Sequence, residues 1–308
     1  MRKTGAAVKR AAAGLLTVLA AAALVSCARK GEPVPALPEP TGSYAVGTMW
    51  LSFTDPGRPE TFTADPEDHR EIAVRIWYPA DVGNGDRPCL YAQPGVLDIP
   101  AQGFSEEMRA GLERLEERLS SIRTHSYKDA RFASGGPFPL VIYTHGYWAG
   151  MNQSTVLMEE LASHGYVAAS IGHPFETNSV TKPDGRVVRF DPRNPEFMLR
   201  GRERQAGLPV ERAIVETADP EKLDALFREY ERLRPKTRES LAIWADDIGF
   251  AIDAFFELNA GDERFRGMID LDGVGVLGHS FGGAASGQAA LDDGRIAAGI
   301  NMDGLQIG

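Results

Sequence analysis

The sequence predicts an α/β fold with a mostly parallel central sheet and helices on both of its faces. Between residues 139 and 302, short apolar segments alternate with longer segments that have the spacing of helices. Strands that are apolar throughout are typical of a parallel sheet, because helices bury both of its faces. Hydrophobic residues make up 43% of the 308 residues, so the chain can build a large core.

The first 26 residues are predicted to be a signal peptide. Four basic residues precede an apolar run from Ala11 to Val25, which is too short to cross a bilayer comfortably. The run ends in Leu24-Val25-Ser26-Cys27, which resembles the cleavage site of a bacterial lipoprotein. The resemblance implies an exported protein, cleaved before Cys27 and anchored by a lipid on its thiol, in the cell envelope, the periplasm or on the extracellular face. An ordinary secretion signal with an incidental cysteine is the alternative.

Charge and cysteine content restrict the possible partners. Residues 1–26 hold four basic and no acidic residues, so the net charge changes from −10 to −14 when they are removed. An acidic domain repels nucleic acid, which argues against that class of partner. If Cys27 is lipidated, Cys89 is the remaining cysteine, and neither an intrachain disulfide nor a cysteine metal site is expected.

Residues 27–42 are predicted to form an extended tether, because four prolines lie between residues 33 and 40. A single domain is expected from residue 43 to residue 308. Its first two strands are predicted at Tyr44–Phe53 and Glu71–Tyr78, which are rich in β-branched and aromatic residues. We expect these strands to pair antiparallel at an edge of the sheet.

Helices and strands then alternate. Residues 104–123 carry apolar side chains at steps of three and four, which predicts a helix. A short apolar strand at 140–144, a helix at 153–164 and a buried strand at 166–171 follow. Strand, helix and strand in this order favour a parallel pair of strands.

The alternation is interrupted between residues 174 and 238, which are rich in charged residues, proline and glycine. This segment is predicted to be a helical cap or lid over the sheet, with one clear helix at 221–233. The elements expected after it are a helix at 241–258, a strand at 274–277, a helix of small residues from 283 and a buried strand at 296–302.

The most informative motif is Gly278-His279-Ser280-Phe281-Gly282, which lies between an apolar run and a run of small residues. Strand, sharp turn and helix are the context in which G-x-S-x-G forms a nucleophile elbow. The glycines allow the tight turn that lifts the serine hydroxyl out of the sheet. Ser280 is therefore predicted to be a catalytic nucleophile, and the side chain of His279 is expected to pack within the fold.

Two backbone amides are predicted to face this serine. Thr144-His145-Gly146-Tyr147 follows a central strand, where a His-Gly segment can offer a backbone N–H to an oxyanion. We expect the amides of Tyr147 and Phe281 to hold the negatively charged oxygen. Trp148 and Phe175, together with Tyr147, are expected to line an acyl pocket, although core packing fits these aromatic rings equally well.

Asp303 is predicted to be the acid of the site. It follows the strand expected at 296–302, so it lies with Ser280 at the carboxyl end of the sheet. An acid in this position orients a histidine and stabilises the charged form of its ring. The alternative is an aspartate that caps a turn before Gly304.

These residues resemble the plasma-type platelet-activating factor acetylhydrolases and their bacterial relatives, which grade into cutinase-like lipases. The resemblance extends from residue 44 onward and rests on the segments 139–146, 161–166, 278–284 and 303–304. It implies an α/β-hydrolase fold that needs no metal or other cofactor and hydrolyses short or oxidised acyl esters, such as the sn-2 acetyl group of a phospholipid, at a lipid–water interface. It also implies that the catalytic serine, the acid and the two oxyanion donors are Ser280, Asp303, Phe281 and Tyr147.

The family's histidine lies beyond the acid, after further strand and helix, whereas no histidine follows Ser280 here. We therefore expect the C-terminal strands of the sheet to be missing, as in a truncated gene model or a fragment. His173 ends a strand at the same edge and is the one conceivable substitute. If residue 308 were the true end, an inactive or poorly folding protein would be expected, because removing a triad member leaves only residual catalysis.

Three functions stay open at this point. The first is a membrane-tethered serine carboxylesterase of the acetylhydrolase type. The second is a related lipase, cutinase, peptidase or dienelactone-type hydrolase, because a fold does not fix the substrate. The third is a catalytically impaired surface lipoprotein that binds a lipid or a partner, which the absent histidine supports and the intact elbow opposes.

Overall fold

The computed structural model describes residues 36–92, 106–189, 191 and 194–305. The predicted signal peptide, Cys27 and most of the predicted tether lie outside the described residues. The described residues belong to two compact units: a small one with residues 36–37, 90–92 and 106–124, and a large one that holds the others. The helix α2 (Glu106–Ser121) of the small unit confirms the helix predicted at 104–123.

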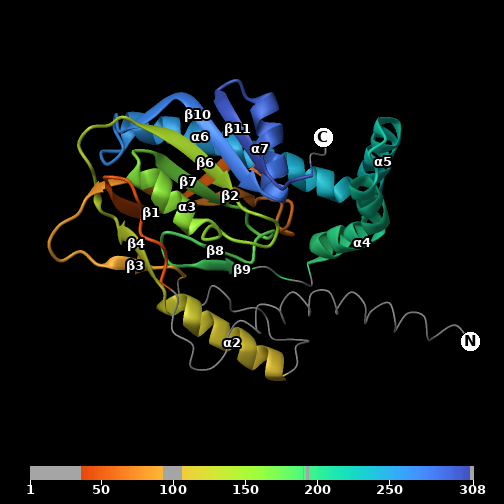
Figure 1. Cartoon of the computed structure of the whole chain (residues 1–308), viewed down its shortest axis with the longest axis horizontal. Helices are drawn as coiled ribbons and strands as arrows, with labels where there is room; N and C mark the ends of the chain where they lie inside the picture. The colour runs from red at the N-terminus through yellow and green to blue at the C-terminus, as the bar shows by residue number, and fades with distance from the viewer. Residues whose placement is uncertain (1–35, 93–105, 190, 192–193, 306–308) are drawn as a thin grey trace, which may run out of the picture. The chain divides into compact units, whose positions relative to one another are not determined.

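A nine-stranded sheet forms the centre of the fold (Figure 1). Its strands are β1 (Ala45–Pro59), β2 (His69–Asp81), β3 (Pro88–Leu90), β4 (Arg123–Lys128), β5 (Arg131–Phe132), β6 (Phe138–Thr144), β7 (Val167–Gly172), β10 (Ile269–His279) and β11 (Ile296–Met302). Their order is β11-β10-β6-β7-β2-β1-β4-β3, and β5 pairs with β2. The pairs β11–β10, β10–β6, β6–β7 and β1–β4 are parallel, which confirms the predicted mostly parallel sheet.

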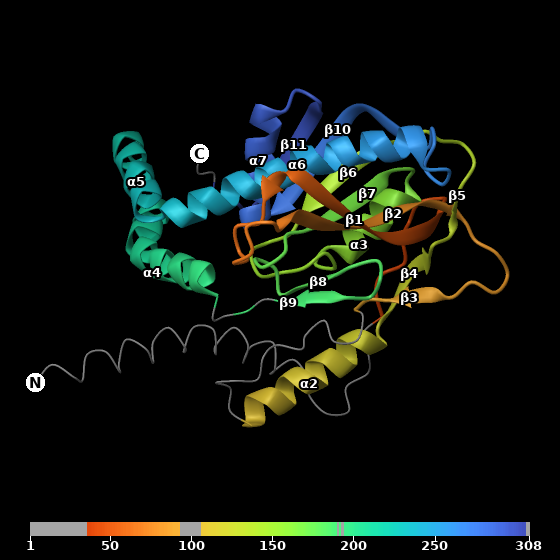
Figure 2. The ribbon, with the colours of Figure 1, turned by 180° about the vertical axis from the view of Figure 1, so that it is seen from behind.

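Helices cover both faces of this sheet. The helices α6 (Pro235–Gly261) and α7 (Phe281–Asp292) bury apolar side chains against one face, in a core that also holds Ile142 and Val276. The helix α3 (Thr155–Ser163) packs on the other face, where Met158 meets the layer of Tyr143. Successive residues of β6 alternate between the two cores, as the pleat of a strand requires. In Figure 2, which views the ribbon from the opposite side, α6 runs across the sheet.

Two strand predictions need correction. β1 and β2 pair antiparallel as expected, but β2 lies inside the sheet between β7 and β1, and nearly all of its residues are buried. β11 has the predicted bounds but is not buried, and Ile300 is 57% exposed. Its position explains the exposure, because among the described residues β10 is the one strand that pairs with β11.

The segment predicted as a cap holds more structure than the sequence indicated. It contains a hairpin of β8 (Ser179–Thr181) and β9 (Val187–Arg189), followed by α4 (Pro195–Glu216) and α5 (Pro220–Leu233). The predicted helix at 221–233 is confirmed as α5. The sequence analysis missed α4 because its apolar residues form no continuous stripe. Accordingly, only three of its residues are buried. Both helices stand beyond the first turns of α6 in Figures 1 and 2.

The end of the predicted tether is fixed to the large unit. The amide of Thr41 donates to Glu160 Oε2 over 2.8 Å, and the amide of Gly42 donates to Ser163 Oγ over 3.0 Å. A Cβ on Gly42 would lie 2.1 Å from the carbonyl oxygen of Ser163, so this contact accepts no side chain. The large unit therefore begins before residue 43. Among the helices that the structure describes, none is both long and apolar enough to cross a membrane.

Candidate active site

Ser280 lies in a strained turn between β10 and α7. Its φ of 53° and ψ of −121° place a residue with a Cβ in a region that such residues rarely adopt. A Cβ on Gly278 would lie 2.1 Å from the carbonyl oxygen of Gly282, and a Cβ on Gly282 would lie 2.2 Å from that of Thr144. Both positions therefore require glycine, which is the local reason for the G-x-S-x-G pattern.

Among the described residues, the backbone of Ser280 is hydrogen-bonded while its hydroxyl is not. The amide of Ser280 donates to the carbonyl of Met302 over 2.8 Å, and its carbonyl accepts from the amide of Ala284 over 3.1 Å. The residue is half-buried, and its hydroxyl does not cap the helix that follows. The turn therefore holds Ser280 rigidly and leaves its oxygen free to react.

The loop after β6 lies directly against the elbow. Thr144, the last residue of β6, is in register with Gly278 of β10. A Cβ added to Gly146 would lie only 3.5 Å from the Cβ of Ser280. The structure thus brings together the two segments that the sequence predicted to share a site.

The two predicted oxyanion donors are available. Among the described residues, neither the amide of Tyr147 nor that of Phe281 donates a hydrogen bond, whereas the next two amides of the loop do. Trp148 donates to the carbonyl of Glu176, and Ala149 donates to that of Gly146. Phe281 opens α7, where helix geometry leaves amides without partners. The oxyanion role of the two amides stays a prediction that this geometry supports.

Asp303 lies beside the elbow at the end of β11. It has a left-handed φ of 62° and is exposed. The side chain of Asn301 fixes the turn, because it accepts from the amide of Gly304 over 2.8 Å and donates to its carbonyl over 3.0 Å. A Cβ on Gly304 would lie 2.4 Å from the carbonyl oxygen of Ser280. The position suits the predicted acid, and its catalytic role stays a prediction.

His173 is committed to a structural contact. It is fully buried, its Nδ1 lies 2.8 Å from Asp247 Oδ2, and its ring stacks on Trp244 with 3.8 Å between centroids. Burial lowers the pKa of His173, although Asp247 opposes that shift. Among the described residues, no histidine is hydrogen-bonded to Ser280 or to Asp303. His173 is therefore not a substitute for the catalytic histidine.

His145 is also buried and neutral. Burial, with a further contribution from His173, lowers the pKa of His145 to about 3. Its Nδ1 lies 2.8 Å from the carbonyl oxygen of Gly146. The side chain therefore has a structural role, and any contribution of this segment to an oxyanion site comes through the backbone.

The aromatic residues of the predicted acyl pocket pack against other rings. Tyr147 points inward, where its hydroxyl donates to Glu176 Oε1 over 3.1 Å. Trp148 stacks on Phe197 with centroids 5.2 Å apart, and Phe175 stacks on Phe62 with centroids 5.7 Å apart. Trp148 and Phe175 are half-buried, so a pocket role for them stays a prediction.

Two buried carboxylates lie behind the site, and the sequence analysis missed both. Glu176 accepts from Ser240 and from Trp244 Nε1, and burial raises its pKa despite the nearby Arg200. Burial would also raise the pKa of Asp247, but Arg70 and the other groups around this carboxylate hold it well below its ordinary value. The signal in the sequence was an aspartate on the apolar face of the helix predicted at 241–258.

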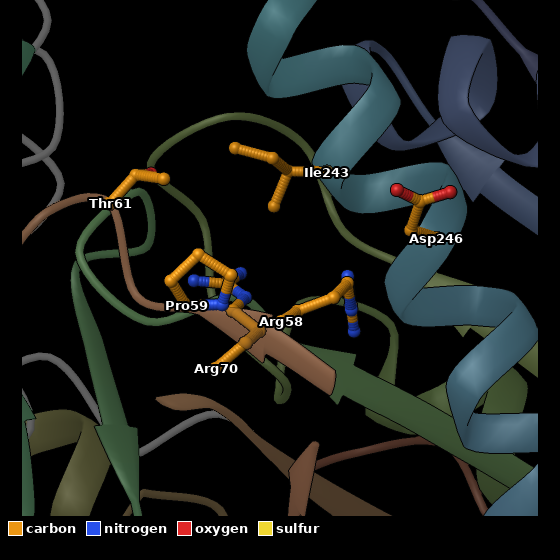
Figure 3. A pocket seen from close by; sticks show the side chains of 6 residues that line it. All are labelled: Arg58, Pro59, Thr61, Arg70, Ile243 and Asp246. Carbon is orange, nitrogen blue, oxygen red and sulfur yellow. The ribbon is translucent and has the colours of Figure 1, made fainter. Parts of the chain in front are cut away.

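A cavity of about 50 Å³ opens beside Arg58 and Arg70 (Figure 3). Its lining consists of Arg58, Pro59, Thr61, Arg70, Ile243 and Asp246. Arg70 and Arg58 both contact the Asp247 carboxylate, so the cavity borders this ion cluster. None of the predicted site residues lines it, and we do not assign it to the active site.

The family model and the curated relatives agree on one family. The model of the family "Platelet-activating factor acetylhydrolase, isoform II" matches residues 31–217, a range that ends before the elbow. The chain is 25% identical over 293 residues to the platelet-activating factor acetylhydrolase of Bos taurus and 24% identical over 285 residues to that of Canis lupus familiaris. These alignments cover 91% and 88% of this chain but 57% and 55% of the relatives, so the chain spans little more than half of their length.

A solved structure supports the fold. The ferulic acid esterase from Streptomyces cinnamoneus is similar with a TM-score of 0.57 and 24% identity, over 88% of this chain and 63% of that one. At this identity the likeness concerns the fold alone. Together with the sheet order and the elbow between β10 and α7, it confirms the predicted α/β-hydrolase fold.

Proposed function

Because the chain belongs to the platelet-activating factor acetylhydrolase family, isoform II, we propose that it acts as a serine carboxylesterase on short acyl esters. The observation that carries the proposal is the Ser280 hydroxyl in a strained elbow, near two amides; none of the three has a hydrogen-bond partner among the described residues. A binding protein would have no need for this strain. The relatives' name describes the removal of an acetyl group, which makes an sn-2 acetyl phospholipid the first candidate substrate.

The proposed reaction has two halves. Ser280 Oγ attacks the ester carbonyl, its proton passes to a general base, and the amides of Tyr147 and Phe281 hold the oxyanion. The tetrahedral intermediate collapses to an acyl-enzyme as the alcohol leaves with the proton, and water then releases the acid by the same route. Losing one oxyanion donor raises such a barrier by about 2.7–4 kcal/mol. Asp303 would orient the histidine that serves as the base.

A second function keeps one observation in its favour. No described histidine is hydrogen-bonded to Ser280 or Asp303, which fits a catalytically impaired lipoprotein that binds a lipid or a partner. A related lipase or cutinase activity is the other alternative, since the fold does not determine acyl length.

A panel of esters separates these functions. For the full-length protein, we expect kcat/KM to be at least about tenfold higher for a phosphatidylcholine with an sn-2 acetyl group than for one with an sn-2 palmitoyl group. A site that fits only a short acyl group cannot bind the palmitoyl chain in the transition state. Release of fatty acid measured by titration at constant pH gives the rates. Preference for palmitoyl would indicate a lipase, and binding of vesicles without hydrolysis would indicate the impaired protein.

We also propose that Cys27 carries a lipid that holds the protein on a membrane of the cell envelope, facing the periplasm or the outside. The support is the apolar run that ends in Leu24-Val25-Ser26-Cys27. Expressed in a bacterium fed an alkyne-labelled palmitate, the wild type should take up label and enter the detergent phase of Triton X-114. Cys27→Ser should lose both properties, whereas Cys89→Ala should keep them. Label retained by Cys27→Ser would refute the anchor.

A further inference from the structure

We propose that Gln153 is a positioning residue that ties the nucleophile elbow to the loop after β6 and so aims the Tyr147 amide at the oxyanion. The proposal rests on the serine esterase function proposed above. Gln153 lies two residues before α3 and is far in sequence from the elbow, yet its side chain contacts both segments. Nothing in the G-x-S-x-G pattern points to it.

The carboxamide of Gln153 contacts three elements. Its Oε1 accepts from the amide of Gly146 over 2.8 Å and from the hydroxyl of Tyr143 in β6 over 3.0 Å. Its Nε2 lies 3.1 Å from His279 Nδ1, in the residue before the nucleophile. One side chain therefore links the central strand, the predicted oxyanion loop and the elbow.

The hydrogen-bond donors fix the orientation of this carboxamide. A backbone N–H can only donate, so the atom that faces Gly146 must be the oxygen. The NH₂ group then faces His279, and because it can only donate, His279 Nδ1 must accept. His279 is consequently held in the tautomer that carries its proton on Nε2. Each member of the chain determines the next, which makes the linkage specific.

The linkage acts on the residue that needs restraint. Gly146 precedes Tyr147, and the φ and ψ of Gly146 set the direction in which the Tyr147 amide points. Glycine has the widest conformational freedom of any residue, so its own backbone does not fix that direction. A Cβ on Gly146 would lie 3.0 Å from His279 Nδ1, so a bulkier and stiffer residue would require the His279 ring to move. The bond from Gln153 supplies the restraint that the residue lacks.

The Gly146 and Tyr147 amides differ in a way that fits this role. The amide of Gly146 is occupied by Gln153, whereas that of Tyr147 has no partner among the described residues. A second bond steadies the clamp itself, because the amide of Gln153 donates to the carbonyl of Gly150 over 2.9 Å. The loop is thus bonded inward at one amide and left open at the next, beside Ser280.

Replacement of Gln153 by methionine keeps the length of the side chain and removes its hydrogen bonds. In the full-length protein we expect kcat to fall by about 10- to 100-fold, because a misplacement near 1 Å can have an effect of that size. KM should change less than about threefold, since the oxyanion forms only in the transition state. The inhibition constant of a trifluoromethyl ketone, which forms an oxyanion adduct with serine, should rise by the same factor as kcat falls.

The matched control is Gln288→Met on α7, where the glutamine bonds Asp292 at a position away from the elbow. It should leave kcat, KM and the ketone inhibition unchanged. If Gln153→Met folds poorly, Gln153→Asn replaces it as the test variant. The asparagine side chain is too short to reach both Gly146 and His279, so the same loss of kcat is expected. A folded Gln153 variant with kcat and ketone inhibition within twofold of the wild type would overturn the proposal.

Hydrogen exchange separates this proposal from the proposed function. If the wild type neither hydrolyses esters nor reacts with a fluorophosphonate at Ser280, the esterase function fails whatever Gln153 does. The amides of residues 145–149 still report on the clamp, and Gln153→Met should speed their exchange at least about tenfold. Unchanged exchange in these residues would refute the linkage itself.

Discussion

Ser280→Ala is expected to lower kcat for ester hydrolysis by about 10⁵-fold or more, with little change in KM. Ser280 Oγ is the one protein atom that forms and breaks a covalent bond with the acyl group. The two backbone amides only donate hydrogen bonds, so they cannot replace it. Alanine removes only an oxygen that makes no helix-capping bond, so the fold should remain intact. Rates with an sn-2 acetyl phospholipid, together with circular dichroism of the variant, test both expectations.

Ser286→Ala is the matched control for this variant. Ser286 lies on α7, the helix that follows the elbow, is fully buried, and its hydroxyl has no partner among the described residues. Its loss should change kcat by less than about twofold and should not destabilise the protein, because it removes an unsatisfied buried group. An active Ser280→Ala variant would contradict the proposed mechanism.

Asp247→Ala is expected to lower the free energy of unfolding by about 3–5 kcal/mol. The Asp247 carboxylate is fully buried and contacts Arg70 at 2.7 Å, His173 at 2.8 Å and Arg58 at 3.0 Å. Removing it leaves the buried guanidinium of Arg70 with Glu60 as its one remaining carboxylate within 4 Å among the described residues. Urea unfolding, followed by fluorescence, measures the difference.

The neighbouring Asp246→Asn variant is the control, since Asp246 is exposed and is not among the carboxylates that form ion pairs with Arg58 or Arg70. It should change the free energy of unfolding by less than about 0.5 kcal/mol.

The pH dependence of the free energy of unfolding gives a second readout for Asp247. Because the folded pKa of Asp247 lies below the ordinary value of 3.8, its contribution is complete above that pH and is lost as the pH falls below it. Equal effects of the two variants would contradict the account of the cluster.

The sequence analysis identified the elements whose signals are local. The elbow, the loop after β6 and Asp303 each follow an apolar strand, and parallel strands place their carboxyl ends at one edge of the sheet. That both segments lie at this edge was therefore predictable from the strands that precede them. The exposure of β11 did not, because the number of strands beside it is a property of the assembled sheet and not of its own residues.

Features that depend on distant pairs could not be predicted. Gln153 and His279 are 126 residues apart, and neither residue type has a fixed partner in such a fold. The helix α4 lacks an apolar stripe, so its periodicity gave no signal. Charged residues such as Glu176 usually lie on the surface, and the burial of Glu176 becomes evident only when the structure supplies its partners.

The reactivity of Ser280 tests the central claim most directly. The full-length protein would be treated with a fluorophosphonate and digested, and the modified residue would be located by tandem mass spectrometry. We expect a single phosphonate adduct on Ser280, formed in parallel with the loss of ester hydrolysis. Loss of hydrolysis with the adduct on another serine, or hydrolysis that persists after Ser280 is fully modified, would contradict the assignment of Ser280 as the nucleophile.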